Sequence, residues 1–156
     1  MGDRTFNKNS GFTLIELSMV ILVAAIIVGT ATPAYFYLVD KARTNKTIDE
    51  IKEMQRDINR YNRKNIHFPD SLAEIYPIPP FDPWGRPYQF LNIKNAPNPG
   101  AINPRTDKSF KRLNADYDLY SQGSDAVSLS PTGASESRDD IIRGKNGDLI
   151  GISIDY

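Results

Sequence analysis

The side chains of this chain that could do chemistry are mainly carboxylates, and two places stand out. Near the N-terminus, Glu16 lies in the stretch GFTLIEL, residues 11–17, where a long apolar run begins. Farther along, Ser124-Asp125 and Ser137-Arg138-Asp139-Asp140 flank a loop that contains several serine residues and a glycine. Closely spaced carboxylates supply the hard oxygen ligands that Ca²⁺ prefers. The loop is therefore a candidate calcium site, and an acidic surface loop is the alternative.

Other kinds of chemistry are poorly supplied. There is no cysteine, which excludes disulfides, thiolate zinc sites and cysteine nucleophiles, and His67 is the only histidine. No G-x-S-x-G, H-E-x-x-H or P-loop pattern occurs. The formal net charge is zero, which gives no reason to expect nucleic-acid binding. We therefore expect a protein that is not an enzyme and does not bind nucleic acid.

One long helix is predicted from about Thr13 to Lys64. Its first half includes 23 residues without a charge, Leu17–Val39, about 34 Å of helix against a hydrocarbon core of about 30 Å. A secretory signal peptide is the alternative, but the apolar run is longer than such a signal and continues into a second helical pattern. The basic residues Arg4 and Lys8 favour a cytoplasmic N-terminus and export of the chain beyond the apolar run.

The rest of the chain predicts a small head of α+β class. The second half of the helix carries apolar residues at three- and four-residue spacing, one stripe of an amphipathic helix. This stripe consists of Ile48, Ile51, Met54 or Gln55, Ile58 and Tyr61. Ser71 and Glu74 predict a capping box on a short helical turn. Strands are predicted at Tyr88–Ile93, Tyr117–Ser121 and Leu149–Ile154, and loops at 95–109 and 122–138. A small antiparallel sheet packed on the stripe accounts for these elements.

Glu16 is the unusual residue of the apolar helix. A carboxylate in a membrane is costly and normally has a partner, yet no Lys or Arg lies within the span. Cleavage between Gly11 and Phe12 would create an α-amino group, which a neighbouring chain could offer to Glu16. The alternative is a membrane helix whose Glu16 sits among the lipid headgroups.

The stretch Gly11-Phe12-Thr13-Leu14-Ile15-Glu16-Leu17 resembles the processing signature of type IV pilins and related proteins. The resemblance covers residues 11 to about 65. It implies that a prepilin peptidase cuts between Gly11 and Phe12 and methylates Phe12, and that Glu16 guides assembly. Pro33 matches the proline that loosens the helix in this family. The implied segments are a leader (1–11), a membrane and filament-core helix (12–39), its amphipathic continuation (40–65) and the head (66–156).

Two head motifs resemble the major pseudopilin, the G subunit, of type II secretion systems. The first is Asp82-Pro83-Trp84-Gly85-Arg86-Pro87-Tyr88, which is also a turn signal because Asp82 can accept backbone donors and Gly85 can adopt positive φ. The second is the acidic loop, which resembles that subunit's calcium loop. The resemblance implies calcium ligation by side chains of Asp125, Asp139, Asp140 and Ser137 and by carbonyl groups of Gln122 and Val127. The span from Asp125 to Asp139 is longer than the compact form of that loop.

The expected function is a structural subunit of a periplasmic pseudopilus fibre in a type II secretion system. Its expected partners are further copies of the chain, prepilin peptidase, the assembly platform, minor pilins and the bacterial inner membrane, with the head in the periplasm. Two alternatives remain open. One is a subunit of a type IV pilus for adhesion, motility or uptake, and the other is a membrane-anchored periplasmic binding domain that does not polymerise.

Overall fold

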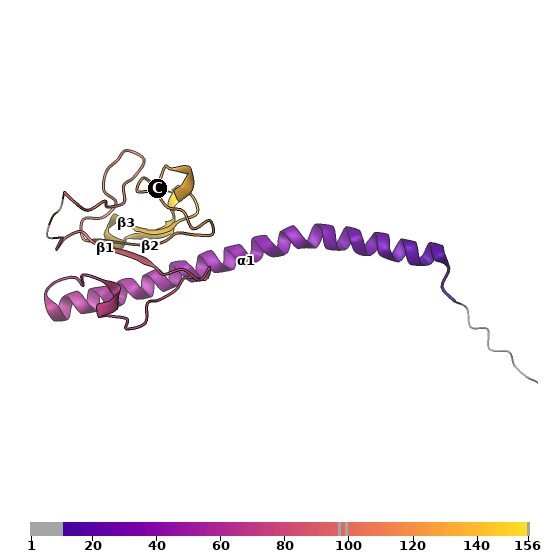
Figure 1. The fold of residues 1–156 in the computed structure, drawn as a ribbon, viewed down its shortest axis with the longest axis horizontal. Helices are drawn as coiled ribbons and strands as arrows, with labels where there is room; N and C mark the ends of the chain where they lie inside the picture. The colour runs from indigo at the N-terminus through magenta and orange to yellow at the C-terminus, as the bar shows by residue number, and fades with distance from the viewer. Residues whose placement is uncertain (1–10, 97, 99, 156) are drawn as a thin grey trace, which may run out of the picture. The chain divides into compact units, whose positions relative to one another are not determined.

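The computed structural model describes residues 11–96, 98 and 100–155, so the predicted leader lies outside the described residues except for Gly11. The chain divides into two compact units, Met1–Asp40 and Lys41–Tyr156. Helix α1 contributes to both units (Figure 1). The elements are α1 (Leu14–Asn65), the 3-10 turn η1 (Leu72–Glu74), β1 (Gln89–Asn92), β2 (Tyr117–Ser121), η2 (Ser135–Ser137), β3 (Ile141–Gly144), η3 (Lys145–Gly147), β4 (Leu149–Ile152) and η4 (Ser153–Asp155). The predicted α+β class is confirmed.

Helix α1 begins and ends within one residue of the predicted bounds. Its N-terminal part is apolar on all sides, and the described side chains from residue 11 to residue 38 are exposed. The helix is long and apolar enough to cross a membrane. Pro33 lies inside it and does not end it.

The four strands form one antiparallel sheet in the order β1-β2-β3-β4. Strand β2 has the predicted bounds, and β1 is one residue shorter at each end. Strand β4 ends at Ile152 rather than Ile154, because the 3-10 turn η4 begins at Ser153.

Sequence analysis missed β3. All four of its residues are buried, so the alternation of apolar and polar residues that marks a half-buried strand is absent. The strand also contains Arg143, a charged residue that is rarely found in a core without a partner. The partners that allow its burial come from other parts of the chain.

The core of the second unit lies between residues 41–65 of α1 and one face of the sheet (Figure 1). The predicted stripe is confirmed, since Ile51, Met54 and Ile58 are buried. They pack against Phe68, Leu72, Tyr88, Tyr117, Leu119 and Ile141. Each buried aliphatic side chain contributes about 1.5–3 kcal/mol relative to exposure.

The short turn at Leu72–Glu74 forms as predicted, but its capping box does not. The Ser71 side chain makes no cap hydrogen bond. The Glu74 carboxylate accepts instead from the backbone N–H of Asp70 at 2.8 Å and from the hydroxyl of Tyr61 on α1. These two donors hold Glu74 away from the position that a capping box requires.

Candidate functional site

The predicted cleavage bond, Gly11–Phe12, lies immediately before helix α1. Residues 11–13 have no regular secondary structure, and the Phe12 side chain is 88% exposed. A protease reaches a backbone bond most readily in an exposed segment without regular secondary structure.

Glu16 has a local role that sequence analysis missed. Its Oε2 atom accepts from the backbone N–H of Thr13 at 2.9 Å and from the Thr13 hydroxyl at 2.8 Å. The backbone N–H of Glu16 donates to the Thr13 hydroxyl oxygen at 3.3 Å. These reciprocal bonds form a capping box over the first turn of α1. The signal was present in the sequence as Thr-x-x-Glu, residues 13–16.

The helix is weakened between Ile26 and Pro33. Pro33 has no backbone N–H, so the carbonyl of Gly29, four residues earlier, loses its usual helical donor. The Thr30 hydroxyl donates to the carbonyls of Ile26 and Ile27, both at 3.1 Å, and the Thr32 hydroxyl donates to the carbonyl of Val28 at 2.7 Å. Threonine hydroxyls bonded in this way compete with the helical ladder and favour bending.

In the second unit, the turn at Asp82–Tyr88 forms as the sequence predicts. Asp82 is buried, and its Oδ1 atom accepts from the backbone N–H groups of Trp84 and Arg86 at 3.0 and 2.9 Å. Gly85 has a φ of +83°, a conformation that glycine adopts without steric cost. Tyr88 is buried in the core, and the half-buried Trp84 packs against it.

This turn is joined to the acidic loop, although the two motifs are far apart in sequence. The Ser121 hydroxyl donates to Asp82 Oδ2 at 2.6 Å, and the Arg86 guanidinium donates to the Ser124 carbonyl at 3.0 Å. The backbone N–H of Gly123 donates to the Ser121 hydroxyl oxygen at 3.2 Å. The turn at Asp82–Tyr88 and the start of the acidic loop are therefore held together by hydrogen bonds.

Two of the predicted calcium ligands, Asp125 and Asp139, lie together. Asp139 Oδ2 accepts from the backbone N–H of Ser124 at 2.6 Å, from its hydroxyl at 2.8 Å and from the N–H of Asp125 at 3.0 Å. A Cβ on Gly123 would lie 2.4 Å from the Asp139 carbonyl oxygen, and Gly123 has a φ of +64°. The close approach of these segments thus requires glycine at 123, a requirement that sequence analysis missed.

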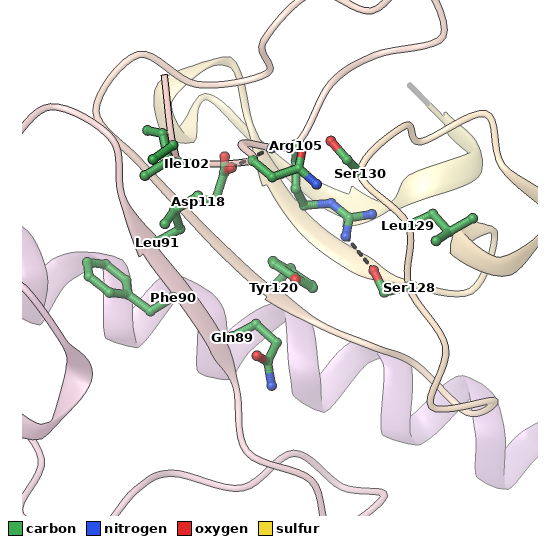
Figure 2. A pocket seen from close by; sticks show the side chains of 12 residues that line it. Gln89, Phe90, Leu91, Ile102, Arg105, Asp118, Tyr120, Ser128, Leu129 and Ser130 are labelled. Atoms are coloured by element: carbon green, nitrogen blue, oxygen red, sulfur yellow. Dashed lines mark hydrogen bonds between the residues drawn. The ribbon is translucent and has the colours of Figure 1, made fainter. Parts of the chain in front are cut away.

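Asp140 faces a different partner. It is fully buried, and its Oδ2 atom accepts from Arg105 Nη2 at 2.6 Å and from the Ser128 hydroxyl at 2.7 Å. The guanidinium of Arg105 also donates to the Ser128 hydroxyl (Figure 2). Burial raises the pKa of the Asp140 carboxyl, and the Arg105 charge opposes that shift. Sequence analysis did not identify Arg105 because 35 residues separate it from Asp140.

The other predicted ligands are engaged within the loop or exposed. The Ser137 hydroxyl donates to the carbonyl of Leu129 at 2.8 Å and accepts its backbone N–H at 2.9 Å. Val127 is exposed, and its N–H donates to Asp125 Oδ1 at 2.8 Å. Gln122 is half-buried. Among the described residues, no group of three or more His, Cys, Asp or Glu is placed to hold a metal ion. Calcium binding stays a prediction.

A cavity of about 430 Å³ opens beside β1 and β2, and Arg105 and Asp118 line it (Figure 2). Asp118 is buried and accepts from the backbone N–H of Arg105 at 2.7 Å and from the Asn114 amide at 2.9 Å. Burial raises the pKa of Asp118, while these hydrogen bonds act in the opposite direction. Asp118 therefore fixes the backbone from which the Arg105 side chain extends.

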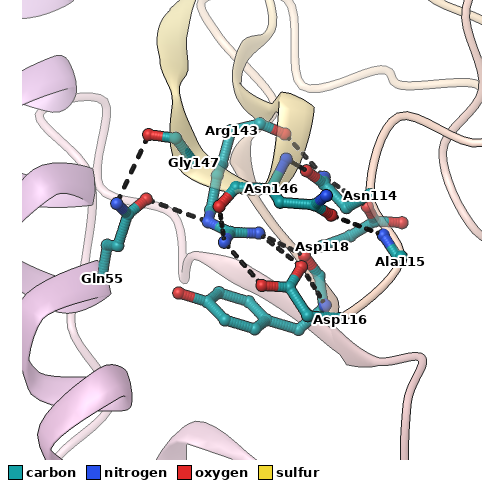
Figure 3. A network of polar contacts seen from close by, with 9 residues as sticks. Gln55, Asn114, Ala115, Asp116, Asp118, Arg143, Asn146 and Gly147 are labelled. Atoms are coloured by element: carbon teal, nitrogen blue, oxygen red, sulfur yellow. Dashed lines mark hydrogen bonds and ion pairs between the residues drawn. The ribbon is translucent and has the colours of Figure 1, made fainter.

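Arg143 explains how β3 can be buried. Its guanidinium donates to both carboxylate oxygens of Asp116, at 2.8 and 2.7 Å, and its Nε donates to Gln55 of α1 at 2.9 Å (Figure 3). It also lies 3.9 Å from the centre of the Tyr117 ring. A bidentate pair to a carboxylate and a ring contact together satisfy a buried arginine. This network joins the sheet to the second half of α1.

Comparisons with known proteins agree with these features. The prokaryotic N-terminal methylation motif matches residues 6–32. The type II secretion system core protein G of Pseudomonas aeruginosa is 27% identical over 139 residues, which cover 76% of this chain and 85% of that protein. The Klebsiella pneumoniae protein of the same name is 26% identical over 141 residues, which cover 86% and 93%. No solved structure matches the chain. This chain therefore combines an N-terminal methylation motif with a long apolar helix, and it is similar to type II secretion system core protein G along most of its length.

Proposed function

We propose that the chain is a structural, non-enzymatic subunit that polymerises into a periplasmic pseudopilus fibre of a type II secretion system. The observation that carries this proposal is the N-terminal half of α1, which exposes an apolar surface on all sides and has Glu16 near its start. Such a surface requires lipid or the apolar surfaces of other helices around it. Transfer from the inner membrane to a bundle of identical helices keeps this surface away from water.

Processing prepares the chain for this transfer. Prepilin peptidase cuts the exposed Gly11–Phe12 bond on the cytoplasmic side of the membrane and methylates the new amine of Phe12. The new positive charge then lies at the start of the apolar helix. Residues 40–156 lie in the periplasm, where the assembly platform and minor pilins act on the subunit.

Glu16 sets the axial register of neighbouring subunits by pairing with the Phe12 amine of another copy. The backbone N–H and the hydroxyl of Thr13 both donate to Oε2, and no hydrogen bond to Oε1 is found among the described residues. Glu16 can therefore cap its own helix with one oxygen and offer the other to a neighbour. In an apolar surrounding this ion pair is strongly favoured over an unpaired charge.

The segment from Ile26 to Pro33 allows α1 to adapt to its neighbours in the fibre. Local loosening of a helix exposes carbonyl groups, which must find other donors in an apolar environment. The hydroxyls of Thr30 and Thr32 already donate to three carbonyls in this segment. These bonds lower the cost of opening the helix around Pro33.

The deciding experiment compares Glu16→Ala and Glu16→Gln with the wild type in cells that assemble fibres. We expect both variants to be cleaved and methylated, as shown by N-terminal mass spectrometry, and to form no fibres in electron micrographs. Ser18→Ala is the matched control, since the Ser18 hydroxyl donates only to the Ile15 carbonyl of its own helix.

Each alternative result has a defined meaning. Fibre yields of Glu16→Ala equal to those of the wild type would refute the register role of Glu16. An intact leader on the wild-type chain would favour the anchored binding domain. Fibres that extend from the cell surface and retract would favour a type IV pilus subunit.

A further inference from the structure

The head contains a buried ion pair next to the predicted calcium ligands. Arg105 and Asp140 have side chains that are 5% and 0% exposed, and 2.6 Å separates Nη2 from Oδ2. Ser128 bonds to both side chains, so Arg105, Ser128 and Asp140 form a closed triangle. The guanidinium carbon also lies 4.3 Å from the centre of the Tyr120 ring.

Arg105 is held firmly in this position by its backbone. Its N–H donates to the buried Asp118, and its carbonyl accepts from the N–H of Leu113 at 3.0 Å. The next residue, Thr106, bridges to Arg112 and to Pro131. The backbone that carries the Arg105 side chain is therefore held in place on both sides within the connection between β1 and β2.

The predicted ligands in this arrangement do not fit an open oxygen cage for calcium, which takes 6–8 oxygen ligands. Asp139 Oδ2 already accepts three hydrogen bonds, and Asp125 Oδ1 accepts one. Asp140 Oδ2 is paired with a positive charge. Asp140 Oδ1 is buried without a hydrogen-bond partner among the described residues.

We propose that the guanidinium of Arg105 does the charge-neutralising work of a bound cation in this head, and that loop 122–140 is ordered without calcium. Asp139 and Asp140 are adjacent carboxylates, and the fully buried one requires a compensating positive charge. Arg105 provides that charge from within the chain. This inference concerns the single subunit and does not depend on fibre assembly.

The experiment measures thermal unfolding of the full chain in detergent micelles, with Trp84 fluorescence as the signal, in EGTA and in about 1 mM calcium. A calcium site at about ten times its Kd would raise Tm by about 5 °C. We expect the wild-type Tm to change by less than about 1 °C.

Variants then test the arginine directly. Arg105→Gln leaves Asp140 buried without its cation, and we expect Tm to fall by about 10 °C or more. Calcium should restore part of this loss, because the carboxylates then become available to a metal. Arg112→Gln is the matched control, since Arg112 is exposed, and it should leave Tm unchanged.

Two results would overturn the proposal. One is a calcium-dependent rise of several degrees in the wild-type Tm, and the other is an unchanged Tm in Arg105→Gln. If Arg105→Gln does not fold, the wild type alone decides by isothermal titration with calcium chloride. Saturable binding heat would refute the proposal, and its absence together with an unchanged wild-type Tm would support it.

Discussion

Replacing Asp82 by alanine tests how the Asp82–Tyr88 turn stabilises the head. Asp82→Ala removes three hydrogen bonds, from the N–H groups of Trp84 and Arg86 and from the Ser121 hydroxyl. The two N–H groups belong to half-buried residues, where water can replace part of the loss, but Ser121 is fully buried. An unsatisfied buried partner costs about 1–3 kcal/mol and each partly hydrated bond costs less. We therefore expect Asp82→Ala to lower the free energy of unfolding by about 3 kcal/mol.

Urea unfolding of the full chain in micelles is a suitable assay, because Trp84 is the only tryptophan and lies in this turn. With a slope of about 1.5 kcal/mol per molar urea, the midpoint should fall by about 2 M. Asp82→Asn keeps an oxygen that can accept from both N–H groups and changes only the Ser121 contact. It should cost about 1 kcal/mol.

The chain contains a matched control for this prediction. Asp107 Oδ1 accepts from the N–H groups of Ser109 and Lys111, two and four residues later, as Asp82 does from Trp84 and Arg86. Asp107 has no bond corresponding to that of Ser121 among the described residues. Asp107→Ala should therefore cost no more than about 1 kcal/mol. A midpoint shift below about 0.5 M for Asp82→Ala, or equal costs for the two alanine variants, would refute the reasoning.

Three further changes test the core, the acidic loop and the helix cap. Ile58→Ala should lower the free energy of unfolding by about 2–5 kcal/mol in urea titrations, whereas Ile78→Ala, at a side chain that is 81% exposed, should change it by less than about 0.5 kcal/mol. Gly123→Ala should lower the melting temperature more than Gly85→Ala does. Both positions have positive φ, but only at Gly123 would the new Cβ collide with Asp139. Equal melting temperatures of the two variants would contradict this. Thr13→Ala removes the capping box and should raise amide exchange in the first turn of α1 about fivefold, for a loss of about 1 kcal/mol; unchanged exchange would show that the cap contributes nothing.

The contacts between the Asp82–Tyr88 turn and loop 122–140 make the position of the loop depend on the turn. Ser121 and Arg86 connect them directly, and the turn also packs on the core that includes Tyr88. A change in the turn should therefore disturb the loop even though no residue of the loop is altered. Arg105 approaches the same loop from the opposite end through Asp140.

The sequence alone determined the features that depend on neighbouring residues. The length of the apolar run predicts the first half of α1, and apolar residues at a spacing of three and four predict the buried stripe of Ile51, Met54 and Ile58. The stretch 11–17 predicts the N-terminal methylation motif. These signals are local because a helix and a processing site are specified by residues within a few positions of one another. The Thr-x-x-Glu pattern at residues 13–16 was equally local and could have been recognised.

Only the tertiary structure decided which distant groups meet. Arg105 donates to Asp140, Arg143 donates to Asp116 and Gln55, and Glu74 accepts from Tyr61. These contacts depend on how the loops fold over the sheet. The spacing of residues along the sequence does not predict that arrangement. The strand β3 was missed for the same reason, since its burial requires partners that come from other elements. Long-range polar partners therefore decide whether an acidic residue of this head faces a metal, an arginine or water.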